Sequence, residues 1–202
     1  DFGQKIESFY SHANRPSYLD LKDGESMVVE FNGLIIEPLY YWISEMFKVA
    51  AVAPPKTICY AHHRWAWAAT TVISDKEYGM MKELFKKCPI YILCRSDKII
   101  DRAILGMWEE HFGARTKSGV PCALASQLFC IGDFIVDIYL DPKASEQWDS
   151  IWAGVKTADD VPRAIFQKTR LHFSHTGRTK VIVTRDAYAA SILRNETLKQ
   201  FR

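Results

Sequence analysis

The sequence predicts an α/β fold: a mixed, largely parallel sheet covered by helices, with an N-terminal antiparallel β-meander and an inserted β-hairpin. From Thr57 onward, apolar strand-like runs alternate with amphipathic helical runs, which is the pattern of a parallel or mixed sheet. Near the start, Asn32-Gly33 separates two short β-like runs, and Asn-Gly favours the positive φ angles of a hairpin loop. Gly132-Asp133 separates two further apolar runs and predicts the inserted hairpin.

The N-terminal part, residues 1–53, is expected to contain the meander and a long helix. A short helix is expected at Phe2 to Ser11, and the meander strands are expected at Ser17 to Leu21, Ser26 to Phe31 and Leu34 to Ile36. Pro38 then suits the first turn of a helix that runs to about Val52, with apolar residues at three- and four-residue steps.

Residues 54–202 are expected to form the alternating part of the same compact domain. The predicted strands are Thr57 to Ala61, Ile90 to Cys94, Gln127 to Ile131, Phe134 to Leu140 and Lys180 to Thr184. The predicted helices are Asp75 to Lys87, Asp97 to Phe112, Pro142 to Val155, Asp160 to His172 and Asp186 to Phe201. Because the chain starts at Asp1 without a methionine or a leader, we interpret it as a domain excised from a longer protein.

The composition excludes several classes of protein. With 202 residues, of which 48% are hydrophobic, the chain can bury a substantial core and is not of the disordered type. Charged residues at Glu45, Lys48 and Lys56 interrupt the longest apolar runs, so no membrane span is predicted. A net charge of only +2 gives no global attraction to nucleic acid.

The five cysteines favour a reducing, cytoplasmic location. They are odd in number, lack C-x-x-C spacing and lie mostly in apolar segments. This pattern is typical of buried thiols and not of a disulfide framework. They are Cys59, Cys88, Cys94, Cys122 and Cys130.

The charges of the C-terminal third are segregated along the chain. Asp133 to Asp160 contains seven acids and two bases, whereas Arg163 to Arg185 contains six bases, two histidines and no acid. A local basic window of this kind indicates an anionic partner. A solvated basic face is the simpler alternative.

Polar clusters follow three of the predicted strands. They are His62-His63-Arg64, Arg95-Ser96-Asp97 and Thr184-Arg185-Asp186. If these strands are parallel neighbours, the clusters meet at the carboxyl edge of the sheet, where open α/β folds bind their ligands. We therefore expect Arg95 and Arg185 to lie close together with an anion between them. Ordinary helix capping by Asp97 and Asp186, or surface ion pairs with the neighbouring arginines, would explain the same residues without a ligand.

The first of these clusters continues into two tryptophans. Trp65 and Trp67 could stack on a planar ligand while His62 or His63 orients it and Arg64 supplies charge. Alternatively, the tryptophans anchor a loop on the core. Adjacent histidines on a strand point to opposite faces, so a metal would need a distant third ligand, and neither a metal nor a cofactor is predicted.

The loop before the last strand is rich in hydrogen-bond donors. His175, Arg178 and Lys180 could bind a phosphate or carboxylate. The chain has neither G-x-x-x-x-G-K-[ST] nor G-x-G-x-x-G after a strand, so standard nucleotide binding has no motif support. It also has no G-x-S-x-G nucleophile elbow.

Three hypotheses follow from these patterns. The first is a sensory or effector domain of a larger regulatory protein that binds a small anionic or aromatic ligand. The second is a hydrolase or transferase that acts on a phosphorylated or nucleotide-like substrate with a histidine as general base. The third is a nucleic-acid-binding domain that uses Arg163 to Arg185. The oligomeric state stays open, with a homo-oligomer among the possibilities. Val181 to Phe201 resembles the end of effector domains in archaeal one-component transcription regulators, over a small part of the chain and without a diagnostic residue.

Overall fold

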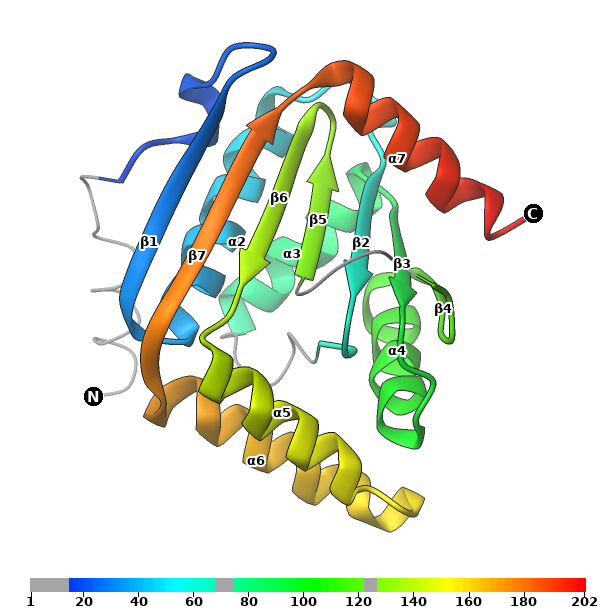
Figure 1. Ribbon diagram of the computed structural model, residues 1–202. Helices are drawn as coiled ribbons and strands as arrows, with labels where there is room; N and C mark the ends of the chain where they lie inside the picture. Colours follow the sequence, from blue (N-terminus) through cyan, green and yellow to red (C-terminus); the bar gives the residue numbers. More distant parts are fainter. Residues whose placement is uncertain (1–14, 68–74, 122–126) are drawn as a thin grey trace.

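The computed structural model describes residues 15–67, 75–121 and 127–202, and within them it confirms the predicted mixed α/β fold (Figure 1). The described residues form one seven-stranded sheet in the order β1-β7-β6-β5-β2-β3-β4. The strands are β1 (Ser26–Leu34), β2 (Cys59–His63), β3 (Ile90–Cys94), β4 (Arg115–Lys117), β5 (Gln127–Ile131), β6 (Phe134–Tyr139) and β7 (Thr176–Arg185).

Parallel and antiparallel pairings divide the sheet into two parts. The pairings of β2 with β3 and of β3 with β4 are parallel, and the other four are antiparallel. Consequently β1, β2, β3, β4 and β6 point one way and only β5 and β7 the other. We call the edge at which those five strands end the carboxyl edge; it is the lower edge in Figure 1.

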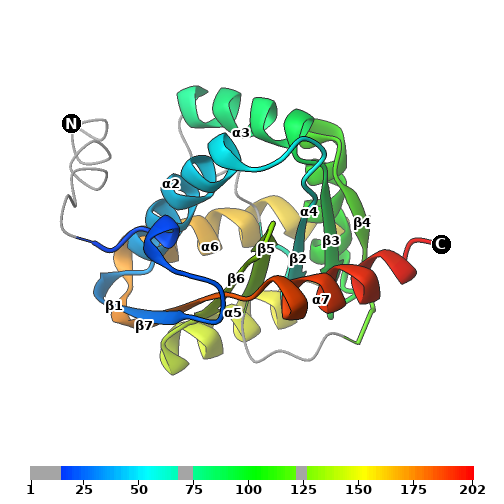
Figure 2. The ribbon, with the colours of Figure 1, turned by 90° about the horizontal axis from the view of Figure 1, so that it is seen from above.

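The helices cover both faces of the sheet and the carboxyl edge. Figure 2 shows α2, α3 and α4 on one face and α7 on the other, and Figure 1 shows α5 and α6 lying across the carboxyl edge. The helices are α2 (Ile36–Val52), α3 (Asp75–Lys87), α4 (Ile99–Phe112), α5 (Pro142–Gly154), α6 (Val161–Ser174) and α7 (Ala187–Lys199). Short 3-10 helices occur at Tyr18–Asp20 and Ala158–Asp160. No helix in the described residues is both long and apolar enough to cross a bilayer.

The predicted N-terminal meander is wrong. Asn32 and Gly33 lie inside β1, which pairs with β7 along its whole length. The glycine is needed for close approach and not for a turn, because a Cβ at Gly33 would collide with the side chain of Glu37, whose Oε1 accepts a hydrogen bond from the backbone N–H of Leu34. The short helix predicted at Phe2 to Ser11 lies outside the described residues.

The first predicted meander strand is a 3-10 turn instead. Ser17 and Asp20 cap it reciprocally. The carboxylate of Glu45 on α2 accepts hydrogen bonds from Ser17 Oγ at 2.7 Å and from the backbone N–H of Tyr18 at 2.8 Å. These groups bind a helix and are therefore not available to a sheet partner.

The inserted hairpin and the alternating helices and strands agree with the prediction. β5 and β6 pair around Gly132, which has a φ of 59° and so suits a tight turn. β7 begins at Thr176, several residues before the predicted start, because its N-terminal half pairs with β1. The main core lies between the sheet and helices α2 to α6, and a smaller apolar cluster under α7 includes Tyr60, Leu128 and Ala190.

Candidate functional site

The polar segment at the end of β2 lies at the carboxyl edge, which α5 and α6 cover. The two histidines are the last residues of β2 and point to opposite faces, as expected for a strand. His62 Nε2 lies 2.7 Å from Thr197 Oγ1 on α7, whereas the fully buried His63 packs against Phe129 on the other face. Burial lowers the pKa of His62 to about 4. Burial, followed by the nearby Lys168, lowers the pKa of His63 to about 3, so both imidazoles are neutral at neutral pH.

Arg64 and Trp65 both bind the same carboxylate of α5. Asp149 accepts hydrogen bonds from Arg64 Nη2 at 2.7 Å and from Trp65 Nε1 at 2.8 Å. The guanidinium also lies 4.2 Å from the centroid of the Trp65 ring. In this structure Arg64 therefore holds α5 against the carboxyl edge, and its charge is already paired.

Trp67 belongs to a cage around a buried lysine. The Nζ atom of Lys168 lies 4.9 Å from the ring centroid of Trp148, 5.6 Å from that of Trp152 and 5.9 Å from that of Trp67. We call these three rings the tryptophan cage. Lys168 is 1% exposed, and no described residue accepts a hydrogen bond from its Nζ. Burial lowers the pKa of Lys168 well below its usual range, although the charges of Asp101 and Cys94 act in the opposite direction.

Asp101 is the buried acid of the same region. Its Oδ1 accepts hydrogen bonds from the backbone N–H of Ala66 and from Trp152 Nε1, both at 2.8 Å, and from Cys94 Sγ at 3.7 Å. Its Oδ2 accepts the backbone N–H of Lys98 at 3.1 Å. Four donors, from β3, α5 and two connecting segments, therefore satisfy this carboxylate without using Lys168. A carboxylate with that many donors is well stabilised as an anion.

A small interior hollow lies next to the cage. Its volume is about 20 Å³, and its walls come from the start of α2, from β5 and β6, and from α5 and α6. The lining residues are Ile35, Pro38, Leu39, Trp67, Gln127, Ile138, Leu140, Trp148 and His172. Only Gln127 and His172 contribute ionisable or amide side chains to a lining that is otherwise apolar or indole.

The polar atoms around this hollow are only partly satisfied. His172 Nε2 accepts a hydrogen bond from Trp67 Nε1 at 3.3 Å, and its Nδ1 lies 2.8 Å from the carbonyl oxygen of Lys168. Burial, followed by the charge of Lys168, lowers the pKa of His172 to about 3. Among the described residues, Gln127 Oε1 and Trp148 Nε1 are buried and have no hydrogen-bond partner. Within the described part of the chain, Gln127 Oε1 is thus an unpaired acceptor, and Trp148 Nε1 and Lys168 Nζ are unpaired donors.

The predicted proximity of Arg95 and Arg185 is wrong. Arg95 follows β3 at the carboxyl edge, but β7 runs antiparallel to β6 and points away from it. Arg185 therefore lies at the opposite edge, where its Nη1 donates to the carbonyl oxygen of Leu21 and its guanidinium lies 5.2 Å from the Phe134 ring centroid. The prediction failed because it took the last strand as parallel to the others, and strand direction depends on tertiary pairing.

The two aspartates beside these arginines have structural roles. Asp186 caps α7, its Oδ1 accepting the backbone N–H of Ala189 at 2.8 Å. Asp97 instead forms an ion pair with Arg102 at 3.1 Å and accepts a hydrogen bond from Ser118 Oγ. Neither aspartate is paired with its neighbouring arginine among the contacts of the described residues.

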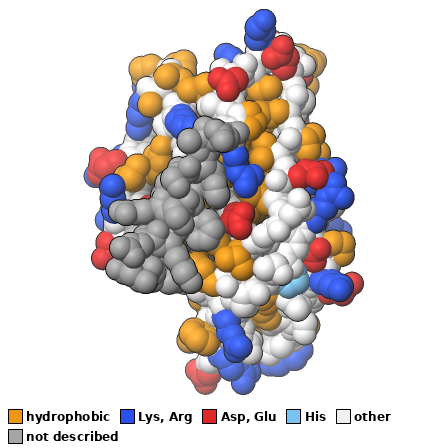
Figure 3. Space-filling model, turned by 90° about the vertical axis from the view of Figure 1, so that its left-hand side faces the viewer, with side chains coloured by type: hydrophobic (Ala, Val, Ile, Leu, Met, Phe, Trp, Pro, Cys, Tyr) orange, Lys and Arg blue, Asp and Glu red, His pale blue; other side chains and the backbone are white. Residues whose placement is uncertain are grey.

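The basic window does not form one continuous surface. Lys168 is buried, Arg163 pairs with Asp160, and Arg178 pairs with Glu30 of β1. Lys180 Nζ also lies 3.8 Å from Glu30, and His175 Nε2 lies 3.3 Å from Asp141. Figure 3 shows the β1 side of the molecule, where basic and acidic side chains are interspersed with apolar ones. The three candidate residues of the loop before the last strand are thus near acids, and none of them lines the interior hollow.

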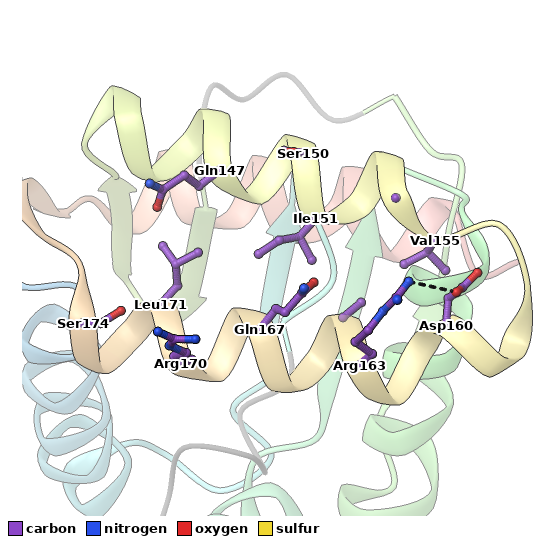
Figure 4. A pocket seen from close by; sticks show the side chains of 12 residues that line it. Gln147, Ser150, Ile151, Val155, Asp160, Arg163, Gln167, Arg170, Leu171 and Ser174 are labelled. Carbon is purple, nitrogen blue, oxygen red and sulfur yellow. Dashed lines mark hydrogen bonds and ion pairs between the residues drawn. The ribbon is translucent and has the colours of Figure 1, made fainter.

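A wider groove of about 700 Å³ lies between α5 and α6. Figure 4 shows that its side chains come from both helices, including Gln147 and Ile151 of α5 and Gln167 and Arg170 of α6. The groove is bordered by the Arg163–Asp160 ion pair. It is a solvated surface feature, whereas the cage and the hollow combine burial with unpaired polar atoms.

Sequence reasoning found the segment after β2 but missed the residues that complete the site. Lys168 and His172 continue the buried stripe of Val161 and Ala164 on α6, and this four-residue spacing was the available signal. Asp101 lies next to Ile100 on the buried side of α4, and Trp148 and Trp152 share one face of α5. A charged residue at an apolar stripe position marks a buried polar group that needs a reason.

No protein-family model matches the chain, and no curated protein matches its sequence. Within the described residues, no three histidine, cysteine, aspartate or glutamate side chains converge in a way that could hold a metal ion. The site is therefore interpreted from its own chemistry. It offers an aromatic enclosure, a buried amine and a few polar anchors, which suit the binding of a small organic molecule.

Proposed function

We propose that this chain is a ligand-binding domain of the sensory or effector type, which takes up a small, largely apolar molecule at the carboxyl edge of its sheet. The ligand would occupy the interior hollow and the adjoining tryptophan cage. Trp67 and Trp148 would form its walls, and Gln127, His172 and Lys168 would be its polar anchors.

The observation that carries this proposal is the group of unpaired polar atoms around an apolar enclosure. Gln127 Oε1, Trp148 Nε1 and Lys168 Nζ are all buried without a partner among the described residues. Each such atom costs about 1–3 kcal/mol of stability, and native proteins keep few of them. Their concentration at the ligand-binding edge of an α/β sheet favours a binding role.

Binding would require α5 and α6 to shift. A hollow of about 20 Å³ has room for one water molecule and not for an organic ligand. The two helices lie across the end of the sheet (Figure 1). α5 contacts the segment after β2 through the Arg64–Asp149 ion pair and through Trp148, which packs against Trp65. A displacement of this pair is a means by which an effector domain could report an occupied site.

The other two hypotheses have less support. A catalytic centre needs a nucleophile or base that substrate can reach, but His63 and Asp101 are both fully buried. A nucleic-acid track needs an exposed basic stripe, but the window contributes one buried lysine and several cations that face acids. A ligand-binding domain needs neither an exposed base nor an exposed basic stripe, and its ligand would contact the buried polar groups directly.

Native mass spectrometry of the freshly purified protein tests the proposal. We expect a mass above 23.2 kDa that falls to the mass of the chain after denaturation, because a ligand in a closed interior leaves slowly. In parallel, a panel of small aromatic and aliphatic compounds is added while tryptophan fluorescence and NMR amide shifts are recorded. Binders should shift the signals of Gln127 and His172. Bare protein in the spectrometer, together with no response to any compound, would refute the proposed function.

A further inference from the structure

We infer that the ligand of this site carries a carboxylate, which is held by the side chains of Lys168 and Trp148. This inference rests on the proposed ligand-binding function and adds the chemical class of the ligand. It is argued from the two unpaired donors, from the arrangement of charges around them and from the balance of protons on binding.

The first argument is the number and kind of donors. Lys168 Nζ and Trp148 Nε1 have no acceptor among the described residues, and the Nζ atom lies 4.9 Å from the Trp148 ring centroid. A carboxylate has two oxygens and can accept from both donors. A phosphate has more acceptor oxygens and more charge, so these two donors would leave more of it without a partner.

The second argument is that the protein's own acid is already satisfied. Asp101 uses both carboxylate oxygens on Ala66, Trp152, Cys94 and Lys98. It influences Lys168 through its charge, but among the described residues it accepts no hydrogen bond from the lysine amine. The amine is therefore left with aromatic faces alone, and a ligand anion would supply the hydrogen-bond acceptor that it lacks.

The third argument concerns net charge. The groups that face the amine are His63 of β2, Cys94 of β3, Asp101 of α4 and His172 of α6. Burial holds both histidines neutral and lowers the pKa of Lys168. A carboxylate that binds together with one proton, taken up by the lysine amine, leaves the net charge of this cluster unchanged. Binding an anion without that proton would add a buried negative charge, at high cost.

The ligand body is defined by the same surroundings. Trp67, Trp148 and the aliphatic side chains of the hollow would contact an aromatic or short aliphatic group, because such surfaces recognise apolar area. Gln127 Oε1 could additionally accept a hydrogen bond from a hydroxyl or amide of the ligand. The expected class is a small aromatic or aliphatic monocarboxylic acid.

Calorimetric titration with paired acids and amides tests the class. The probes are benzoate, phenylacetate and hexanoate, each compared with its neutral amide, and inorganic phosphate. We expect at least one acid to bind about tenfold to a hundredfold more tightly than its amide, the range of a buried charge-assisted hydrogen bond. Repeating the titration at pH 8 in HEPES and in Tris, which differ in ionisation enthalpy, should reveal uptake of up to one proton per ligand.

Variants separate the anchor from the fold. Lys168→Met should abolish both the preference for the acid and the proton uptake. Trp148→Phe keeps an aromatic ring without the indole N–H and should weaken binding of the acid several-fold. Lys143→Met on the exposed part of α5 is the matched control and should change neither. Unchanged acid binding by Lys168→Met would overturn the inference.

The probes also distinguish this inference from the function on which it rests. If an amide binds as tightly as its acid, or if phosphate alone binds, the inference of a carboxylate ligand is wrong, but the proposed binding function stands. If no probe binds and the purified protein carries no extra mass, the proposed function fails together with the inference.

Discussion

At the scale of single residues, Lys168 is a buried side chain that the stability of the fold does not explain. Its amine is buried among three indole rings and donates no hydrogen bond to a described residue. Burial of an amine without an acceptor costs free energy in either protonation state. Such a residue is expected where function, and not stability, determines the side chain.

We predict that Lys168→Met stabilises the ligand-free protein by about 1–3 kcal/mol at pH 7, because it removes an unpaired buried polar group and places a thioether sulfur against the rings. The pKa of Lys168 is lowered on folding, so the unfolded chain binds more protons, and the wild type gains stability as pH rises toward the unfolded pKa. The advantage of the variant should therefore shrink toward pH 10. Urea unfolding at pH 7 and pH 9 measures it, with Lys143→Met expected to stay within about 0.5 kcal/mol of wild type. A destabilised Lys168→Met would contradict this reasoning.

The buried histidines predict sensitivity to acid. Burial lowers the pKa of His63 and that of His172 to about 3, whereas both titrate near 6.5 in the unfolded chain. Between pH 6.5 and pH 3 the unfolded state binds more protons, so stability falls as pH is lowered through this window. Urea unfolding at pH 7, 6 and 5 should show the decline, and His172→Gln should make it shallower. The same slope in His172→Gln as in the wild type would rule out this residue as a cause, with the half-buried His111→Gln as the control.

At the scale of elements, caps and stripes explain most of the local structure. Asp141 is the N-cap of α5, where its side chain accepts backbone N–H groups of Lys143 and Ala144, and Pro142 is the first residue of the helix. Asp186 caps α7 in the same way. Local residue types do not predict which strands pair. Asn32 and Gly33, for example, are typical of a turn but lie within β1.

We predict that Asp186→Ala lowers the free energy of unfolding by about 1 kcal/mol, because it removes the side-chain acceptor for the backbone N–H of Ala189. α7 buries little of its own surface, chiefly Ala190 and Thr197, so it should also fray. Amide hydrogen exchange in α7 should increase relative to that in α4. The matched control is Asp159→Ala, because Asp159 is exposed and is the N-cap of neither α6 nor α7. Equal effects of the two substitutions would argue against the cap.

At the scale of the whole molecule, the sheet brings together groups that are far apart in sequence. β2 and β3 carry His63 and Cys94 to the carboxyl edge, α4 brings Asp101, and α6 brings Lys168. The segregated acidic and basic stretches of the sequence become partners in part, since Asp141 lies beside His175 and Asp160 beside Arg163. The segregation of charges along the sequence is therefore explained in part by ion pairs within the molecule and does not by itself indicate a charged surface.

The cysteines give a prediction for the whole chain. Cys59, Cys88, Cys94 and Cys130 form no disulfide and are buried, and Cys122 lies outside the described residues. We expect thiol titration of the unreduced protein to give five reactive thiols in denaturant and far fewer in the native state, because burial protects them. Titration of the native protein is the internal control. Three or fewer thiols in denaturant would indicate a disulfide and would contradict the proposed reducing, cytoplasmic location.

The sequence by itself determined the α/β class, the hairpin around Gly132 and nearly every helix, because these depend on local periodicity, turn residues and caps. It also led us to expect His62 to Trp67 at the carboxyl edge of the sheet, where β2 ends. Tertiary structure alone decided that β7 is antiparallel, which separates Arg185 from Arg95, and that Lys168 points inward among Trp67, Trp148 and Trp152. Strand direction and the surroundings of a buried charge depend on contacts between residues far apart in the chain, such as Phe134 with Arg185 and Trp67 with Lys168, and the local pattern of a single sequence does not contain them.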